Sequence, residues 1–363
     1  MDSSRDDPEK SGSCSEDSPG QVLNAGIDRF RRGLFAGALE LFDRAISLNP
    51  DSARAWNGRG AALGNLGYFD LAFEACDTAV AMDPGYFRAW SNRGWVLGYL
   101  GRNAEALESL DRAIALQPDF AEAWYTRGWV LSNLGRLPDA LASCDRSVGL
   151  NPDDAEAWNM RGNVLVALGQ HEDALGSYDR VLSLSPFLPG AWFNRGNTLA
   201  HLGRHAEALD AYDKAIALRP DYAEAHNNRG NSLCTLGRPA EAADAYFTAV
   251  SLRPDYAEAW YNHGYALSGL GRHEDAIISY DIATNLRPVY AEAWYNRGVA
   301  LSALGRDEEA VASYDKAIAI SPGDAGAWHA RGNALRRLGR DKEAAASHES
   351  AAALDPKFAV KGS

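Results

Sequence analysis

The apolar positions of this chain recur with a period of 34 residues, and each period contains two stretches of helical spacing. In the period that begins at Ala291, apolar or small residues lie four, seven and ten positions after Trp294. A second set lies four, seven and eight positions after Ala310. Both spacings are typical of one face of an α-helix. Each period is therefore predicted to form two amphipathic helices.

Ten such repeats run from Pro19 to Phe358 without an insertion or a deletion. All ten have glycine at the eighth and fifteenth positions, alanine at the twentieth and proline at the thirty-second. The second glycine is expected to take the left-handed conformation that ends the first helix, and the proline to stop the second helix. The eighth and twentieth positions lack bulk, which lets two helices approach closely. Each repeat is therefore predicted to be a helical hairpin.

Tryptophan at the fourth position completes the pattern W-x3-G-x2-L-x2-L-G…A-x3-Y-x2-A…P and is expected to occupy the core. The pattern and its period resemble the tetratricopeptide (TPR) repeat family. Ten repeats of 34 residues carry this resemblance over 340 of the 363 residues. It implies an all-α fold, a right-handed α-solenoid superhelix of ten helix-turn-helix units whose first helices line a concave groove. Stacking is expected on physical grounds too, because a lone hairpin cannot bury its apolar face.

The repeat array is expected to span residues 19–358. Residues 1–18 are acidic and rich in serine, and are expected to be a disordered tail, with phosphorylation as a minor alternative role. Residues 359–363 form a short C-terminal tail. Arg29 and Arg32 occupy positions that are leucine in the other repeats. Because terminal repeats need polar outer faces, the array is expected to be complete.

The net charge of −13 and the pI of about 5.1 argue against nucleic acid as a partner, because phosphate binding needs a basic surface. No apolar run reaches the length of a membrane span, and the N-terminus has no apolar secretory segment. The four cysteines are Cys14, Cys76, Cys144 and Cys234. Cys76 and Cys144 are two repeats apart, too far for a disulfide, so a reducing, cytoplasmic location is expected.

The sequence contains no phosphate loop, dinucleotide fingerprint or zinc-ligand spacing. His201 and His205 lie four residues apart, but Gly203 breaks the helix between them. Acidic pairs such as Glu172 and Asp173 fall at the start of a second helix, where negative charge suits the helix dipole. We therefore expect no catalytic residue, no cofactor and no metal.

Arginine fills the seventh position in eight repeats, and aspartate fills the twenty-fifth in eight. Two of the exceptions coincide, because Phe247 replaces aspartate in the repeat just before His263 replaces arginine. We therefore expect a ladder of inter-repeat ion pairs, from Asp43–Arg59 to Asp315–Arg331. Such pairs would fix the register of stacking more than they stabilise it. The alternative is that each arginine only reaches solvent past the helix.

Asparagine holds the sixth position in six repeats. A side-chain amide offers a donor and an acceptor, which matches a peptide unit. The run resembles the asparagine ladder inside the TPR superhelix of O-GlcNAc transferases, which implies that it holds the backbone of an extended peptide. The alternative is local polar contacts. The six residues are Asn24, Asn92, Asn194, Asn228, Asn262 and Asn296, of which the last four lie in consecutive repeats.

Other positions of the expected groove carry aromatic and amide side chains. Aromatic residues exposed in a concave surface are typical binding anchors, with packing between hairpins as the alternative. The aromatic candidates are Trp95, Tyr99, Tyr125, Trp129, Tyr261, Tyr265 and Tyr295. The amide candidates are Asn159, Asn163, Asn197, Asn227 and Asn231. The paired basic residues of a chaperone-tail clamp are not found, so that ligand is not predicted.

We interpret the chain as a non-catalytic protein–protein interaction scaffold that binds an extended segment of a partner, without nucleic acid or membrane. One alternative is a regulatory, substrate-selecting subunit whose catalytic part is on another chain. The five residues after the array are expected to leave no room for a transferase domain. The other alternative is an architectural spacer or a self-associating protein.

Overall fold

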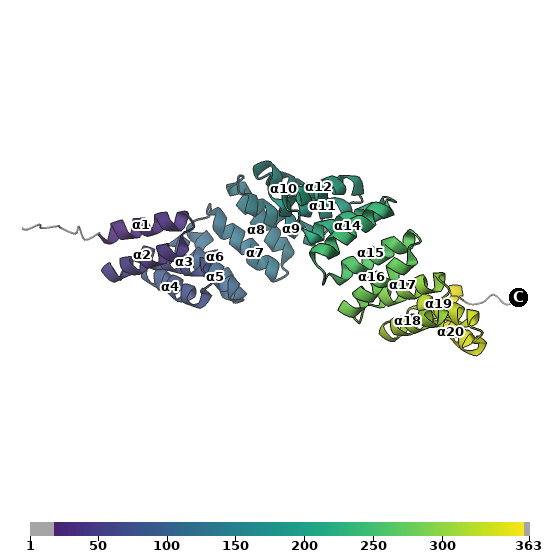
Figure 1. The fold of residues 1–363 in the computed structure, drawn as a ribbon. Helices are drawn as coiled ribbons and strands as arrows, with labels where there is room; N and C mark the ends of the chain where they lie inside the picture. Colours follow the sequence, from purple (N-terminus) through teal and green to yellow (C-terminus); the bar gives the residue numbers. More distant parts are fainter. Residues whose placement is uncertain (1–17, 359–363) are drawn as a thin grey trace, which may run out of the picture. The chain divides into compact units, whose positions relative to one another are not determined.

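The computed structural model describes residues 18–358, and within this range it contains twenty α-helices, one 3₁₀ helix and no strand. Every first helix begins at the first residue of its repeat, and Figure 1 draws the helices as coiled ribbons in chain order. The expected tails at residues 1–17 and 359–363, and Cys14, lie outside the described residues. Ser18 is described, and its hydroxyl caps the first helix by accepting a hydrogen bond from the Gln21 amide.

The helices alternate as first and second members of each repeat. The first helices are α1 (Pro19–Arg31), α3 (Ala53–Asn65), α5 (Phe87–Tyr99), α7 (Ala121–Asn133), α9 (Ala155–Ala167), α11 (Pro189–His201), α13 (Ala223–Thr235), α15 (Ala257–Gly269), α17 (Ala291–Ala303) and α19 (Ala325–Arg337). The second helices are α2 (Phe35–Leu48), α4 (Phe69–Met82), α6 (Asn103–Leu116), α8 (Leu137–Leu150), α10 (His171–Leu184), α12 (His205–Leu218), α14 (Pro239–Leu252), α16 (His273–Leu286), α18 (Asp307–Ile320) and α20 (Asp341–Leu354). The 3₁₀ helix η1 (Pro356–Phe358) follows α20.

The fifteenth-position glycine makes the turn inside each repeat. All ten of these glycines have φ between 71° and 84°, the left-handed region that glycine enters without steric penalty. At Gly305, the amide donates to the Ser302 carbonyl, and the next amide, of Arg306, donates to the Leu301 carbonyl. These bonds satisfy carbonyls at the end of α17, so the predicted helix-ending role is confirmed.

The eighth-position glycine allows the two helices of a hairpin to pack closely. A Cβ atom placed on Gly196 in α11 would lie 2.6 Å from the Tyr212 ring in α12. The twentieth-position alanine, Ala208 in the same hairpin, is fully buried. A large buried side chain at the twenty-fourth position, here Tyr212, therefore fills the space that glycine and alanine leave open.

The described chain divides into an N-terminal unit, which ends at Gly169, and a C-terminal unit, which begins at Gln170. Within each unit, second helices pack on their own first helix, as α4 does on α3, and on the first helix of the next repeat, as α4 does on α5. First helices of neighbouring repeats also contact each other, for example α3 with α5 and α5 with α7. Each unit is thus an α-solenoid of stacked hairpins with a continuous apolar interior.

The fourth-position tryptophans are half-buried rather than fully buried, which differs from the core role expected of them. Each indole N–H donates to the carbonyl of the proline that ends the preceding repeat, as in Trp158 to Pro152 at 2.9 Å. His226 replaces tryptophan in one repeat and keeps a 3.1 Å contact from Nε2 to the Pro220 carbonyl. The tryptophan therefore both packs in the core and forms a hydrogen bond to the preceding repeat. The ring stays partly exposed to solvent.

The predicted ladder of inter-repeat ion pairs is confirmed in both units. Arginine Nε and aspartate Oδ1 lie 2.6–2.8 Å apart in all eight pairs. Where the repeat has a buried serine at its twenty-third position, the guanidinium also donates to it, as in Arg93 to Ser109 at 2.7 Å. Where the pair is lost, the Phe247 and His263 rings lie with centroids 5.8 Å apart. The arginines with a serine partner therefore tie two second helices together.

Candidate peptide-binding groove

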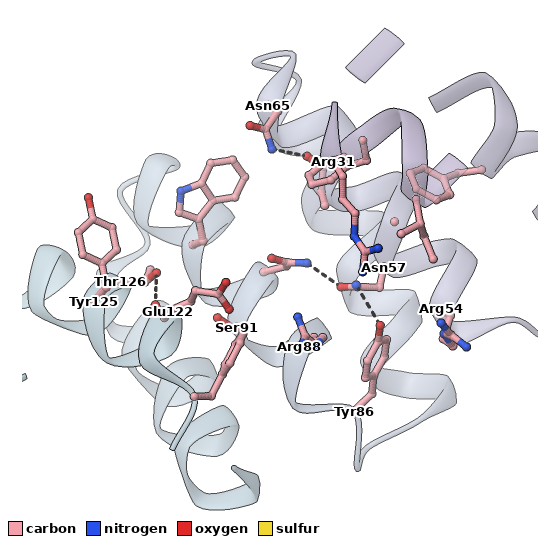
Figure 2. A pocket seen from close by; sticks show the side chains of 18 of the residues that line it. Arg31, Arg54, Asn57, Asn65, Tyr86, Arg88, Ser91, Glu122, Tyr125 and Thr126 are labelled. Atoms are coloured by element: carbon pink, nitrogen blue, oxygen red, sulfur yellow. Dashed lines mark hydrogen bonds between the residues drawn. The ribbon is translucent and has the colours of Figure 1, made fainter. Parts of the chain in front are cut away.

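A cavity of about 910 Å³ runs along the first helices of the N-terminal unit. Its walls come from α1, α3, α5, α7 and α9, from turns that precede them, and from Phe42 of α2. Figure 2 shows Arg31, Asn57 and Tyr86 on one side of this groove and Glu122 and Tyr125 on the other. Residues from five successive repeats therefore line a common space, as an elongated ligand requires.

Amide side chains form a hydrogen-bonded chain across the groove (Figure 2). Asn92 Nδ2 donates to Asn57 Oδ1 at 2.8 Å, and Asn57 Nδ2 donates to the Tyr86 hydroxyl at 3.4 Å. Asn57 is buried at 8% exposure, whereas Asn92 is half-buried. Within the described residues, the carbonyl oxygen and second amide proton of Asn92 form no hydrogen bond. Asn92 is thus held in orientation while one donor and one acceptor remain available.

The aromatic candidates of the N-terminal unit divide into lining and packing residues. Trp95 and Tyr125 line the groove, but Trp129 does not belong to its lining. The rings of Trp95 and Trp129 cover Gly64 and Gly98 of the preceding repeats, where a Cβ atom would collide with them. Packing between hairpins, the alternative considered for these aromatics, therefore accounts for much of their contact. Trp95 has both roles.

Tyr99 lies in an aromatic cluster beside these tryptophans and is 53% exposed. Its ring stacks on Phe69 with centroids 4.8 Å apart and also contacts the Trp95 and Trp129 rings. The cluster joins three successive repeats through ring contacts, which stabilise the stacking beyond simple area burial.

In the C-terminal unit, the predicted asparagines contact neighbouring amides and hydroxyls. Asn228 Nδ2 donates to Asn197 Oδ1 at 2.8 Å. Asn262 Nδ2 donates to Asn227 Oδ1 at 3.0 Å and to Asn231 Oδ1 at 3.3 Å. Local polar contacts, the alternative considered for these residues, therefore use part of their hydrogen-bonding capacity. Asn227 is fully buried, which corrects its expected place on an open groove surface.

The remaining candidates vary in exposure. Asn296 Nδ2 donates to the Tyr261 hydroxyl at 3.1 Å, and Tyr261 packs beside Tyr290 with ring centroids 5.0 Å apart. Tyr265 is 57% exposed. Asn163 and Asn231 are exposed, whereas Asn159, Asn194, Asn197 and Tyr295 are half-buried. Side chains from the asparagine run are thus present at the surface, each already in contact with protein groups.

Sequence reasoning overlooked the charged residues of the groove. The second position of the repeat holds Arg54 and Arg88 in α3 and α5 but Glu122 and Glu156 in α7 and α9. All four line the cavity. The signal is visible in the sequence as a change of sign of the charge at one repeat position.

The acidic end of the groove affects the pKa of Tyr125. Burial, followed by the charges of Glu156 and Asp154, raises the pKa of Tyr125 to about 12. Asp154 also caps α9 by accepting hydrogen bonds from the amides of Glu156 and Ala157. The Tyr125 hydroxyl therefore remains protonated at neutral pH and can donate a hydrogen bond to a ligand.

Within residues 18–358, no three histidine, cysteine or acidic side chains come together as ligands for a metal ion. In the same range, no helix combines the length and the apolar character that crossing a membrane requires.

Family models of the tetratricopeptide repeat match most of this chain. The matches cover residues 23–87, 91–155, 146–189, 159–223, 207–257, 227–288, 261–325 and 327–359. The chain therefore belongs to the tetratricopeptide repeat family. The expected all-α solenoid of helix-turn-helix units is confirmed by the same matches and by the helices described above. Among the curated proteins, no sequence matches this chain.

Several solved structures resemble parts of it. A crystal structure of MamA is 27% identical, with 47% of this chain and 93% of that chain covered and a TM-score of 0.45. YrrB, described as a TPR protein with an unusual peptide-binding site, is 28% identical over 52% of this chain and 97% of its own, with a TM-score of 0.47. The Cut9–Hcn1 hetero-tetramer matches 93% of this chain and 87% of its own at 15% identity and a TM-score of 0.48.

Proposed function

We propose that this protein is a non-catalytic interaction scaffold that holds an extended segment of a partner protein in the groove of its N-terminal unit. The observation that carries this proposal is the convergence of Asn92, Trp95 and Tyr125 on one cavity of about 910 Å³. This volume lies within the range of ordinary ligand pockets, about 300–1,000 Å³. A groove of that size accepts several residues of peptide but not a folded domain.

The chemistry of the groove suits a peptide backbone. The free carbonyl oxygen and amide proton of Asn92 match the donor and acceptor of one peptide unit. Asn57 and Tyr86 hold the Asn92 side chain in place, so its ordering is complete before a ligand arrives. Such preorganisation lowers the entropy lost on binding. Trp95 and Tyr125 offer apolar surface on either side for ligand side chains.

The remaining predicted residues stay part of the proposal as further contact positions, Trp129 and Asn163 in the N-terminal unit and the others in the C-terminal unit. Their exposed atoms offer the same kinds of contact as the groove around Asn92, namely hydrogen bonds from amides and apolar surface from aromatic rings. These residues are Trp129, Asn163, Asn194, Asn197, Asn228, Asn231, Tyr261, Asn262, Tyr265 and Asn296. We also propose a cytoplasmic, reducing location, which the free thiols of Cys76, Cys144 and Cys234 support, and no binding of nucleic acid.

Peptide selection followed by calorimetry tests this proposal. Peptides selected from a random display library against the full chain would be titrated into the parent and into Asn92→Ala. One net hydrogen bond contributes about 0.5–1.5 kcal/mol, so affinity should fall about twofold to tenfold. Asn133→Ala is the matched control, because Asn133 is an exposed asparagine on α7 outside the groove lining. Equal affinities for the parent, Asn92→Ala and a Tyr125→Ala variant would place binding elsewhere.

A regulatory subunit of an enzyme assembly and a self-associating spacer remain alternative functions. Light scattering across a range of protein concentrations distinguishes a self-associating spacer from a peptide-binding scaffold and from a regulatory subunit. A mass that rises with concentration, combined with no peptide selected, would favour self-association.

A further inference from the structure

The charges that line the groove of the N-terminal unit are sorted by sign along its length. Arg54, Arg88, Glu122 and Glu156 occupy the same position of four successive repeats. Their helices follow in order, because α3 contacts α5, α5 contacts α7, and α7 contacts α9. Arg31 adds to the basic end and Asp154 to the acidic end. The groove therefore has one positive half and one negative half; Figure 2 labels its arginines and Glu122.

These charges are not satisfied within the protein. All four second-position side chains are exposed, and within the described residues none of them forms an ion pair. Arginines elsewhere behave differently, since Arg59 is paired with Asp43 and Arg102 with Glu105. Like charges on adjacent repeats repel each other in the free protein. A ligand with the complementary charges removes this repulsion, so the sorted charges favour binding more than stability.

Arg88 is positioned in the groove by aromatic rings. Its guanidinium carbon lies 5.4 Å from the centroid of Phe87 and 5.2 Å from that of Phe120. Cation–π contacts at these distances restrict the side chain without neutralising its charge. Arg88 stands at the border between the two halves, beside the repeat that contributes Glu122.

One repeat of the C-terminal unit balances the charge at this position. Glu224 forms an ion pair with Arg253, whose guanidinium also lies 4.7 Å from the Tyr256 ring centroid. The repeat that holds Glu122 has Asn151 where this arginine stands. Glu258 and Glu292 occupy the same repeat position in the C-terminal unit and form no ion pair within the described residues, so the feature of the N-terminal groove is that unpaired charges of both signs line one cavity.

The spacing of the repeats sets the spacing of the ligand charges. Packed helices lie about 8–10 Å apart, and an extended peptide advances about 3.3 Å per residue. One repeat therefore corresponds to about three residues of ligand. Two acidic residues about three positions apart would face Arg54 and Arg88, and two basic residues with the same spacing would face Glu122 and Glu156.

We propose that the groove selects an extended partner segment of bipolar charge, with acidic residues against α3 and α5 and basic residues against α7 and α9. This inference rests on the proposed function, because it assumes that a peptide occupies the groove. The order of charges along the groove follows from the order of the repeats.

Three fluorescent peptides of equal length test the proposal by anisotropy with the full-length protein at low ionic strength. The first has two aspartates followed by two lysines, each about three residues apart. The second has the same composition with the signs alternating, and the third has glutamine at all four positions. The bipolar peptide should bind about tenfold more tightly than the alternating one, as expected for several exposed ion pairs together. Salt should reduce that difference.

Charge reversal in the protein provides the second arm. In Glu122→Arg/Glu156→Arg the groove becomes basic throughout, so a uniformly acidic peptide should replace the bipolar one as the preferred ligand. The matched control is Glu258→Arg/Glu292→Arg, which makes the same change at the same repeat position in the C-terminal unit. The control should keep the parental preference. Because all four glutamates are exposed, circular dichroism should show folded protein in each case.

The outcomes separate this inference from the proposed function. Equal binding of all three peptides, with loss in Asn92→Ala, would retain a peptide groove and overturn charge selection. No binding of any peptide would overturn both. A preference for the bipolar peptide that persists in Glu122→Arg/Glu156→Arg would place charge recognition outside the groove and also overturn the inference.

Discussion

The two units of this protein share one framework and differ at the positions that a ligand could reach. In the N-terminal unit, Arg54 and Arg88 stand without ion pairs beside a cavity. In the C-terminal unit, one repeat holds Glu224 at the same position, paired with Arg253, whose guanidinium lies over the Tyr256 ring. Both units keep the glycine turn, the close helix contact and the aspartate–arginine ladder.

This comparison separates what specifies the fold from what specifies binding. The framework residues touch only their own hairpin and the next one, so they recur wherever a hairpin must stack. The second, fifth, sixth and ninth positions lie on first helices and change from repeat to repeat. Variation at these positions alters the surface that a ligand could reach, while some of these residues, such as Trp95 and Trp129, also pack between hairpins. Differences between the units at these positions are therefore informative about function.

The largest expected effect concerns the part of the framework that both units share. Gly60→Leu in the N-terminal unit and Gly196→Leu in the C-terminal unit should each destabilise the protein by at least about 1–3 kcal/mol, the usual range for overpacking. A side chain at Gly60 would collide with the Cys76 sulfur, and one at Gly196 with the Tyr212 ring. Gly176→Leu is the matched control, because nothing lies within 4 Å of a Cβ there. Urea unfolding that is unchanged at either buried glycine would refute the close-contact role.

A smaller effect is expected at the tryptophan position. Truncation of a fully buried tryptophan to alanine lowers the free energy of unfolding by about 3–5 kcal/mol, but Trp158 is half-buried. Trp158→Ala should therefore destabilise by about 2–3 kcal/mol, which includes the hydrogen bond to the Pro152 carbonyl. Trp192→His should lose less, since His226 shows that histidine keeps the contact with proline. Equal losses for the two substitutions would mean that the polar link contributes nothing.

The sequence predicted the framework well because each of its signals is local and repeated. The turn at Gly305 and the pairing of Asp281 with Arg297 follow from spacing and from comparison between repeats. The coincident exceptions Phe247 and His263 indicate the partner of each arginine from the sequence alone.

The groove was less predictable because it depends on side-chain torsions and on neighbours that differ from repeat to repeat. Asn227 and Asn228 are adjacent in sequence, yet Asn227 is fully buried and Asn228 is half-buried. Trp95 covers Gly64 because that repeat happens to have glycine where others have larger residues. No single-repeat pattern encodes such pairs, so the expected site and the observed cavity overlap only in part.

The smallest expected effect tests whether the aspartate–arginine ion pairs contribute to the free energy of unfolding or only fix the register of stacking. Phe247→Asp with His263→Arg would restore the missing pair in the C-terminal unit. The native arginines of the ladder are 17–27% exposed and the aspartates 44–58%, so solvent screens each pair. A double-mutant cycle should therefore give a coupling of about 0.5–1 kcal/mol. The Asp213–Arg229 pair, measured in the same way, is the reference.

The pH dependence of the same variant sharpens this test. Burial, followed by the charge of Arg272, lowers the pKa of His263. The unfolded chain then binds a proton more readily than the folded chain, so the stability contributed by neutral His263 is complete above about pH 6.5 and is lost as the pH falls below it. Arginine at this position stays charged in both states and removes that loss. It can also donate to the Ser279 hydroxyl, as Arg297 donates to Ser313.

The double-mutant cycle has two informative outcomes. A coupling energy near zero at positions 247 and 263, beside a clear coupling energy at Asp213–Arg229, would show that packing at this junction has changed so that it no longer accommodates the ion pair. A coupling energy equal to the reference would show that the junction can still form the ion pair. Phe247 and His263 would then replace the ion pair without changing how the repeats stack.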